Sequence, residues 1–586
     1  MGDHLNLLTT YSKIKNESIA YLINKYNASI VEEASEFSNS STVLQLLISV
    51  VDYKIKILIS LPFNFPDSFP KVSLEEESYN RLYPLPHLSK SKTLCIFDEV
   101  LASPNPENPL GILDATVEKT KETLEKGILK ENLEDYIDEF ETYWIEESNS
   151  KFISIVQPSN IAEEIYLVPF QYSNWSYSGL LANDKIEALN WIQNLGGIAQ
   201  EKNIIKVLYI PLSTSIKFPF IENNKDIYNL IKHDKELLHA LSKYLTKQKR
   251  PTKVLFSMKM NDEYSWGMWE HLEPFKKEVL LYKGYKRTHT QIKGFRKGKT
   301  QGYLEIIRDF PKMKIDKHSV EDIRTERLIK RGGDGVHRNK DLKMAFIGCG
   351  AIGSNIIQDL ADTDVNHMLF VDYDILSFEN INRHICGANY VNRFKTDSIK
   401  DKLTEHNPAM CIHTYKGDIL SLLKQTPNTL NNYDLTVVAV AHLPTELRLS
   451  QLQQEGVIQK PLLFVWVEPY LAGGHAILVH PEDKINLKSL FDSNGSYKYQ
   501  ILKNGNEYAK KEFGCNTSYI PYGTFELKKF TLDMITFVQG QLQLTEHRSQ
   551  AFTWFGDVAE QRKNKRLLAA KWVGVQNYTS RIIPLH

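Results

Sequence analysis

The sequence lacks the features that mark several protein classes. Its 586 residues include only five cysteines, and no two of them form a C-x-x-C pair, which argues against a zinc knuckle and against a disulfide framework. Lysine plus arginine and aspartate plus glutamate number 71 each, so net charge gives no case for nucleic acid or an anionic membrane as the main partner. The longest apolar run near the start, 43–51, is too short to span a bilayer, and residues 1–10 lack a signal-peptide layout. These absences predict a cytoplasmic protein.

A glycine-rich turn between two apolar strands stands out in the C-terminal half. Residues 344–347 form an apolar strand that leads into the hexapeptide GCGAIG, and a helix and a second strand ending at Asp372 follow. Gly348 permits a tight turn, Gly350 lets backbone amides approach a phosphate, and Gly353 lets the helix pack closely on the sheet. A helix N-terminus favours anions. We therefore expect a Rossmann-like nucleotide site in which Asp372 holds a ribose hydroxyl.

Two cationic side chains after the second strand indicate which nucleotide the site binds. The turn alone fits sites for NAD, FAD, S-adenosylmethionine and ATP about equally. Asn380 and Arg383 follow the second strand, and Lys395 comes next. Arginine binds phosphate bidentately and lysine supplies a point charge, so together they suit an α-phosphate under attack. This pattern favours ATP chemistry over an NAD-dependent dehydrogenase.

With these residues, the chain from 324 onward resembles the ubiquitin-activating and ThiF/MoeB-like adenylating enzymes. The resemblance implies ATP as a substrate and a homodimer formed through this domain. It places Asp372 on the ribose, Arg383 and Lys395 on the triphosphate, and Asn380 as a nearby polar contact.

The same resemblance implies magnesium and one further arginine. Where the family usually carries a magnesium-binding aspartate, this chain reads Ala-His-Leu-Pro at 441–444, so the metal ligand is unassigned. The family's arginine from a segment before the first strand corresponds to either Arg324 or Arg327.

A proline-rich bend and a cysteine loop characterise the N-terminal third. The bend residues are Pro62, Phe65, Pro66 and Pro70. With the helix and strands around them and the loop containing Cys95, they resemble the ubiquitin-conjugating fold over about 1–148, which implies that Cys95 carries a thioester. The usual His-Pro-Asn before the cysteine is missing. Only His87 is found in that region, and it either orients the loop or has a purely structural role. Asp98 either assists the incoming amine or is a solvated surface residue.

The roles of the remaining cysteines are inferred from the residues next to them in the sequence. Cys515 lies in a polar stretch at the place where ubiquitin-type activating enzymes carry the cysteine that captures the adenylated C-terminus, and Lys510 and Lys511 would favour its thiolate. The alternative is an exposed loop cysteine without a role. Cys349, Cys386 and Cys411 are expected to be structural, small packing residues.

Between the two ends, the sequence shows strands and helices but no recognisable chemistry. We predict a mixed α/β multidomain protein with a ubiquitin-conjugating-like domain at 1–150, an α/β linker domain at 151–318 and an adenylation domain at 319–586. The acid-free segment 283–299 is either a solvated basic hairpin or a surface for phosphate backbones or an acidic partner.

Together, the ubiquitin-conjugating-like domain and the adenylation domain predict that one acyl group is passed from one cysteine to the other. ATP would adenylate a protein C-terminus, Cys515 and then Cys95 would carry it as a thioester, and a target amine would receive it. This fusion resembles the bacterial ubiquitin-transferase-like family of type II CBASS anti-phage operons, which implies that the operon's CD-NTase, a cyclic-nucleotide synthase, is the activated protein. The alternatives are a sulfur-carrier-protein adenylyltransferase and a non-enzymatic nucleotide-binding scaffold.

Overall fold

The computed structural model describes residues 2–31, 42–98, 100–217, 220–247, 251–260, 263–272, 311–333, 335–336, 339, 341–511, 518–542 and 548–585. Cys515 and the basic segment 283–299 lie outside these residues. The chain divides into two compact units. The first contains 1–170, 174–188 and 200–324, and the second contains 171–173, 189–199 and 325–586. No helix among the described residues is long and apolar enough to cross a membrane.

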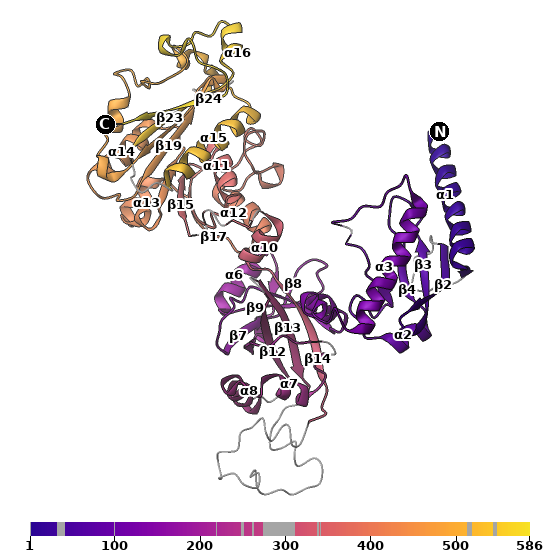
Figure 1. The fold of residues 1–586 in the computed structure, drawn as a ribbon. Helices are drawn as coiled ribbons and strands as arrows, with labels where there is room; N and C mark the ends of the chain where they lie inside the picture. The colour runs from indigo at the N-terminus through magenta and orange to yellow at the C-terminus, as the bar shows by residue number, and fades with distance from the viewer. Residues whose placement is uncertain are drawn as a thin grey trace, which may run out of the picture. The chain divides into compact units, whose positions relative to one another are not determined.

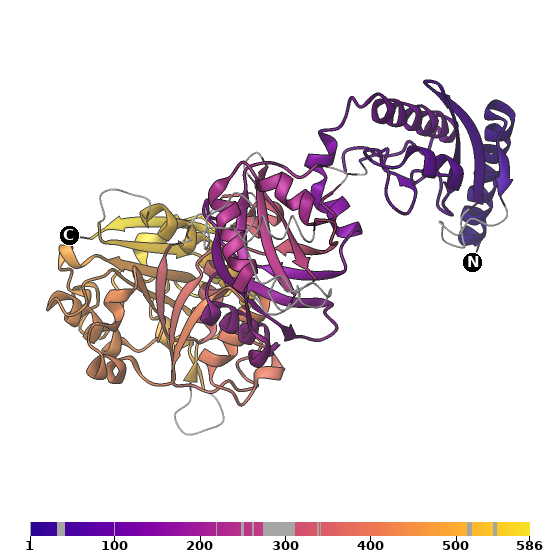
Figure 2. The ribbon, with the colours of Figure 1, turned by 90° about the horizontal axis from the view of Figure 1, so that it is seen from below.

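The N-terminal part of the first unit is an antiparallel sheet with helices packed on it (Figure 1). The strands, in sheet order, are β1 (Ser29–Val31), β2 (Thr42–Val50), β3 (Tyr53–Leu61), β4 (Lys71–Leu74) and β5 (Thr93–Leu94), and the helices are α1 (Gly2–Tyr26), α2 (Glu76–Leu82) and α3 (Pro109–Leu129). Helix α3 lies against β2 (Figure 2). The Asp114 carboxylate on α3 accepts hydrogen bonds from the hydroxyls of Tyr21 and Tyr26 on α1, at 2.8 and 2.7 Å, and so joins the two helices.

The rest of the first unit is a closed barrel of seven strands in the order β11-β12-β13-β14-β6-β9-β7. The strands are β6 (Ser150–Ser154), β7 (Glu163–Val168), β9 (Tyr177–Ala182), β11 (Ile205–Leu212), β12 (Thr252–Met260), β13 (Glu263–His271) and β14 (Ile315–Asp322). The helices are α4 (Asp135–Asp138), α5 (Phe140–Glu146), α7 (Asn224–Ile231) and α8 (Lys235–Lys247). Helix α6 (Lys185–Leu195) begins in the first unit and ends in the second. The mixed strand and helix content of the linker was predicted, but its closure into a barrel was not.

The second unit is built on an eight-stranded sheet of order β17-β16-β15-β18-β19-β20-β23-β24, whose first five strands are parallel. The strands are β15 (Lys343–Ile347), β16 (His367–Val371), β17 (Cys411–Tyr415), β18 (Leu435–Val438), β19 (Leu462–Val467), β20 (Gly473–Val479), β23 (Gln550–Phe555) and β24 (Thr579–Pro584). The helices are α10 (Thr325–Gly332), α11 (Ala351–Ala361), α12 (Lys395–His406), α13 (Ile419–Gln425), α14 (Leu443–Gln454), α15 (Thr524–Leu542) and α16 (Val558–Lys563).

Alternation along β15 explains why this sheet is covered on both faces. Met344 and Phe346 belong to one buried cluster, which includes residues of α11, α12 and α15. Ala345 and Ile347 belong to a second cluster with residues of α13 and α14. Because successive side chains of a strand point to opposite faces, the apolar run of β15 serves both layers. The Rossmann-like arrangement predicted from the glycine turn is therefore present.

The strand order also determines where a ligand can bind. The chain runs outward from β15 to β16 and β17, then returns to place β18 on the other side of β15. In open parallel sheets, ligands bind outside the carboxyl ends of the strands where the order reverses in this way. That point lies between β15 and β18.

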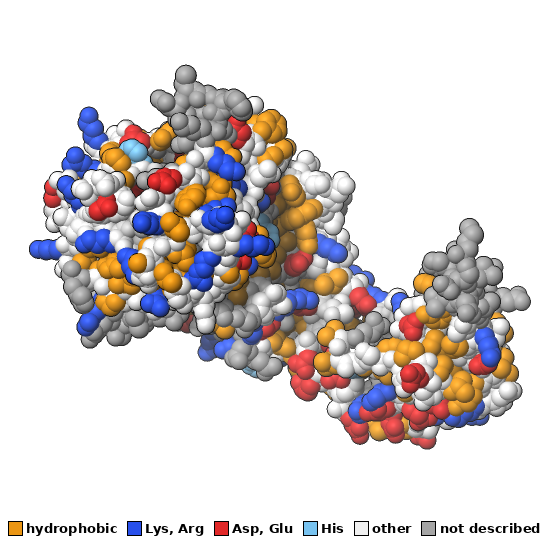
Figure 3. Space-filling model, turned by 90° about the horizontal axis from the view of Figure 1, so that it is seen from above, with side chains coloured by type: hydrophobic (Ala, Val, Ile, Leu, Met, Phe, Trp, Pro, Cys, Tyr) orange, Lys and Arg blue, Asp and Glu red, His pale blue; other side chains and the backbone are white. Residues whose placement is uncertain are grey.

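Lysine and arginine side chains are scattered among apolar ones on the face of this unit seen in Figure 3.

Candidate nucleotide and acyl-transfer sites

The glycine turn follows β15 directly and leaves room for a phosphate. Gly348 has a φ of 90°, and a Cβ there would lie 2.6 Å from the carbonyl oxygen of Ala439, which follows β18. Gly350 precedes α11 as its N-cap, without a side-chain cap hydrogen bond, and a Cβ on it would meet nothing within 4 Å. The helix N-terminus therefore opens onto free space, as a backbone anion site requires.

Asp372 closes this turn from the end of β16. One carboxylate oxygen accepts the backbone N–H of Cys349 at 2.6 Å, and the other accepts that of Asp374 at 2.8 Å. Burial raises the pKa of Asp372, while these two bonds and the charge of Lys395 act to lower it. The half-buried carboxylate thus stands beside the turn, where the sequence placed a ribose contact.

The two predicted phosphate-binding cations differ in their surroundings. Lys395 begins α12, is 8% exposed, and its Nζ lies 2.5 Å from a carboxylate oxygen of Asp374. The carbonyl of Arg383 accepts the side-chain amide of Asn355 on α11 at 2.9 Å, which places its backbone at the glycine-turn helix. Its guanidinium contacts the chain beyond β22, because Nη1 donates to the carbonyl of Ile520 at 3.2 Å.

Asn380 and Arg324 have partners that give them structural roles. The Asn380 side chain accepts the N–H of Ser377 at 3.1 Å and so stabilises its own turn. Arg324 belongs to the first unit, where its Nε and Nη2 donate to the two carboxylate oxygens of Asp322 at 2.9 and 2.6 Å. Of the two candidate arginines, Arg327 is the one in the second unit, on α10.

The residues after β18 do not form a metal site. Ala441 and His442 stand where the resemblance calls for an aspartate, and within the described residues no three His, Cys, Asp or Glu side chains could hold a metal ion. Mg²⁺ is commonly held by one or two carboxylates together with substrate phosphates, so ATP chemistry does not need a protein cage. The residues present do not fit a magnesium ion held by protein ligands alone.

A buried carboxyl that the sequence analysis missed lies on α14, the helix that follows β18. Glu446 is 5% exposed, and its Oε1 has no hydrogen-bond partner. Burial raises its pKa to about 7. The buried face of α14 also carries Ser450 and Gln453, so this face is too polar for apolar periodicity to reveal it.

Cys95 lies in an exposed loop immediately after β5. Its backbone N–H donates to the carbonyl of His87 at 2.9 Å, and the neighbouring Leu94 is buried. The Asp98 carboxylate accepts the N–H groups of Val100 and Leu101 and so turns the loop. A cavity of about 500 Å³ adjoins the cysteine, lined by His87, Cys95, Ile96, Phe97, Asp98, Lys119, Glu122, Thr123, Lys126, Asn132, Asp135 and Glu139.

The described residues on either side of Cys515 return to the glycine-turn region. Strand β21 (Lys510–Lys511) precedes it and pairs with β22 (Ser518–Tyr519). Beyond β22, the carbonyl of Ile520 accepts from Arg383, and the Arg383 guanidinium lies 4.8 Å from the ring centre of Tyr522. The start of α15 is joined to the same region, because Thr524 donates to the carbonyl of Asn382 at 2.6 Å.

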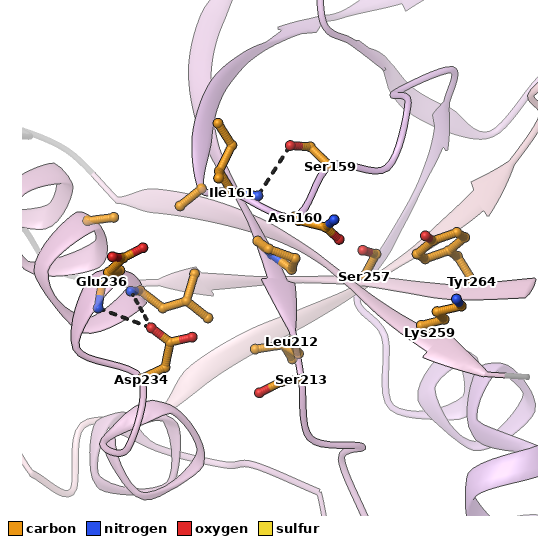
Figure 4. A pocket seen from close by; sticks show the side chains of 14 residues that line it. Ser159, Asn160, Ile161, Leu212, Ser213, Asp234, Glu236, Ser257, Lys259 and Tyr264 are labelled. Carbon is orange, nitrogen blue, oxygen red and sulfur yellow. Dashed lines mark hydrogen bonds between the residues drawn. The ribbon is translucent and has the colours of Figure 1, made fainter.

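The other three cysteines and the barrel cavity stand apart from these sites. Cys349 and Cys386 are fully buried, but Cys411 is exposed on the edge strand β17, so the packing role expected for it is wrong. The barrel has a cavity of about 370 Å³ lined by side chains such as Ser257 and Tyr264 and by residues of α8 (Figure 4). None of the residues predicted from the sequence as catalytic or nucleotide-binding lines it.

Two family models match the two ends of the chain. Residues 325–546 match the ThiF family, and residues 24–153 match the Prokaryotic E2 family B. These matches and the sheet topology confirm the predicted α/β architecture, with an E2-like domain at one end and a Rossmann-like ThiF domain at the other.

Individual relatives are similar to parts of the chain only. The DNA damage tolerance protein RHC31 of Saccharomyces cerevisiae is 23% identical over 29% of this chain and 46% of its own length. Ubiquitin-like modifier-activating enzyme 5 of Oryza sativa subsp. japonica is 28% identical over 15% and 21%, and the molybdopterin-synthase adenylyltransferase of Haemophilus influenzae is 34% identical over 15% and 36%. The chain thus spans less than half the length of these curated relatives. A crystal structure of E. coli MccB with ATP is 18% identical, with a TM-score of 0.28, over 39% of this chain and 64% of that one.

Two glycines of the turn should respond differently to a methyl group. In Gly353→Ala the new Cβ would lie 2.0 Å from the carbonyl oxygen of Gly348, so we expect a loss of stability of about 1–3 kcal/mol. In Gly350→Ala nothing opposes the methyl, so the melting temperature should hold while ATP binding weakens. Thermal unfolding and ATP titration calorimetry measure the two effects. Equal melting temperatures for both variants would contradict the close packing at Gly353.

Glu446 should make stability depend on pH. The carboxyl ionises near its ordinary pKa of 4.5 in the unfolded chain but only near 7 when folded. The contribution of Glu446 to stability is therefore greatest below pH 4.5 and falls as pH rises towards 7, by about 3 kcal/mol at most. The neutral Glu446→Gln variant lacks this loss, so its melting temperature should rise relative to the native protein between those pH values. A difference that stays constant with pH would mean that a counter-charge stabilises the ionised carboxylate.

Proposed function

We propose that this chain, which joins an E2-like domain to a ThiF-family domain, uses ATP to activate the C-terminal carboxylate of a carrier protein and conjugates it to an amine. The carboxylate oxygen attacks the α-phosphorus of ATP, and pyrophosphate leaves. The thiolate of Cys515 attacks the acyl adenylate, forms a thioester and releases AMP. The thiolate of Cys95 then takes the acyl group and frees Cys515, and the amine of a target displaces Cys95 to form an amide.

The observation that carries this proposal is the position of Arg383. Its backbone carbonyl is bonded to α11, which begins at the glycine turn, and its guanidinium binds the segment that follows Cys515. One residue thus links α11 with the described segment that begins at β22, beyond Cys515 in the sequence. In an adenylation followed by capture on a thiol, the carboxylate oxygen first attacks the α-phosphorus of ATP, and the thiolate then attacks the carbonyl carbon of the same carboxyl group.

The other residues of the turn have simple tasks in this reaction. The open N-terminus of α11 and the ammonium of Lys395 would stabilise the charge that develops on the phosphates. Asp372 would hold the ribose. Magnesium would bind with the phosphates of ATP and neutralise part of their charge, and no ligand for it is assigned among the residues of this chain.

The partners are part of the proposal. We infer a CD-NTase-like cyclic-nucleotide synthase as the carrier, a homodimer formed through the ThiF domain, and a role in anti-phage defence, because an E2-like domain followed by a ThiF domain resembles the fusion of CBASS operons. A sulfur-carrier-protein adenylyltransferase would use the ThiF domain alone. The E2-like match at 24–153 and the exposed Cys95 argue against that alternative, and against a purely non-enzymatic scaffold.

Replacing each cysteine separately should reveal the order of the relay. In Cys515→Ala, adenylation should persist while the reductant-sensitive adducts on both cysteines disappear. In Cys95→Ala, the adduct on Cys515 should remain while final conjugates disappear. Mass spectrometry of adducts trapped on the full-length protein in cells identifies the modified cysteine and the carrier together. Unchanged conjugates from Cys95→Ala would refute the proposed order.

Arg383→Ala should abolish activation itself. Loss of the guanidinium should lower ATP–pyrophosphate exchange, measured with a CD-NTase-like protein as carrier, by about 100-fold. Arg448→Ala is the matched control, because Arg448 is an exposed arginine of the same domain, on α14. Exchange at the native rate in Arg383→Ala would move the triphosphate site elsewhere, and no exchange by the native protein would contradict the proposed function.

A further inference from the structure

His87 is held in an unusual conformation directly beside the Cys95 loop. Its φ is 63°, in the left-handed region that non-glycine residues seldom occupy. Its carbonyl accepts the N–H of Cys95 at 2.9 Å, and its own N–H donates to the hydroxyl of Tyr143 at 2.6 Å. Such a conformation persists only where its surroundings determine it strongly, so these contacts fix the backbone that leads to the cysteine.

Both ring nitrogens of His87 face carboxylates. Nε2 lies 2.9 Å from Oδ2 of Asp135, and Nδ1 lies 3.1 Å from Oε1 of Glu139. A neutral imidazole carries only one N–H, so this arrangement is satisfied fully by the doubly protonated ring. The hydrogen bond to Glu139 is the largest cause that raises the pKa of His87. Burial acts to raise the pKa of Glu139, but the hydrogen bonds from His87 and Tyr143 outweigh it and lower that pKa.

Tyr143 also belongs to the hydrogen-bonded residues around His87, because its hydroxyl donates to Oε2 of Glu139 at 2.8 Å. His87, Asp135, Glu139 and Tyr143 are called the His87 network below. Its two acids and its tyrosine come from one short segment, α4 and the start of α5.

That segment is held by the barrel. Phe140 and Trp144 on α5 are buried within the barrel's hydrophobic cluster. The indole N–H of Trp144 donates to the carbonyl of His318 on β14 at 2.9 Å. The groups that contact His87 are therefore fixed by a part of the chain to which the sequence assigned no role.

We propose that His87 is the positioning residue of the Cys95 site, which holds the cysteine loop against α4 and α5 through the His87 network. This inference rests on the proposed relay, in which Cys95 accepts the acyl group. His87 acts through the backbone, by accepting the Cys95 N–H at a fixed place, and takes no part in bond making. Loss of the ring's second proton removes one of the two carboxylate contacts and loosens the loop.

The other charged groups around the cavity are already paired. From α3, the Glu122 carboxylate accepts from Lys119 at 2.7 Å and from Lys126 at 2.8 Å. On the loop itself, Asp98 accepts two backbone N–H groups. Asp135 and Glu139 are therefore the acids that contact the ring, and the network should be complete below the ordinary histidine pKa of 6.5 and weaken as pH rises through the raised pKa of His87.

Hydrogen exchange of the full-length protein, read by mass spectrometry on the peptide containing Cys95, measures the N–H bond to His87 directly. After correction for intrinsic rates, protection of this peptide should fall about tenfold from about pH 6 to about pH 9 in the native protein. His87→Ala should show the low value throughout. Glu139→Gln and Asp135→Asn should lose protection at a lower pH than the native protein, and His239→Ala, an exposed histidine of α8, should match the native protein.

A shift of the pH profile in the two acid variants separates positioning from a general loss of structure, which would not move a midpoint. Identical protection in native protein and His87→Ala would overturn the inference. The inference would also be overturned if the protection of this peptide showed its midpoint at the same pH in Glu139→Gln as in the native protein.

The acyl adducts trapped on Cys95 and Cys515 test whether the His87 network affects transfer of the acyl group to Cys95. In cells, His87→Ala should lower the amount of adduct on Cys95 relative to Cys515 about tenfold, while the Cys515 adduct remains. An unchanged ratio would overturn the positioning role and leave the relay intact. Absence of both adducts from the native protein would refute the relay instead, and the exchange measurement would still decide whether His87 fixes the loop.

Discussion

The close approach of the glycine turn to the end of β18 is the constraint on which the second unit depends. Gly348 can pass the carbonyl of Ala439 only because it has no Cβ. That passage lies where the strand order reverses, so it places the N-terminus of α11 at the crevice between the two halves of the sheet. Asp372 then binds the turn through the N–H of Cys349, and Lys395 follows at the start of α12. The polar groups of the proposed nucleotide site thus come from the turn after β15, the end of β16 and the start of α12.

Arg383 and His87 each contact a part of the chain that is distant in sequence. Arg383 binds a carbonyl more than a hundred residues further on, and His87 binds two acids about fifty residues further on. The contacts of His87 leave the neighbouring Cys95 exposed. In the proposed relay, this combination of a fixed backbone and an accessible sulfur would let Cys95 receive and give up an acyl group.

Sequence reasoning succeeded where the signal is local. The roles of Gly348 and Gly353 follow from which backbone positions tolerate no Cβ, and the proline bend and the exposed loop of Cys95 are read from neighbours in the chain. It failed where the answer depends on tertiary contacts. Cys411 is exposed on an edge strand, and the acids around His87 come from another segment.

Helix α5 belongs structurally to two bodies at once. Its Tyr143 contacts the loop of Cys95, while its Phe140 and Trp144 fill the interior of the barrel. A protein fragment that ends before α5 would lose the hydroxyl and the acid that hold His87, and one that ends after α5 would expose two large aromatic side chains to water. The E2-like domain is consequently not a removable module. A substitution at α5 can therefore affect both the Cys95 loop and the interior of the barrel.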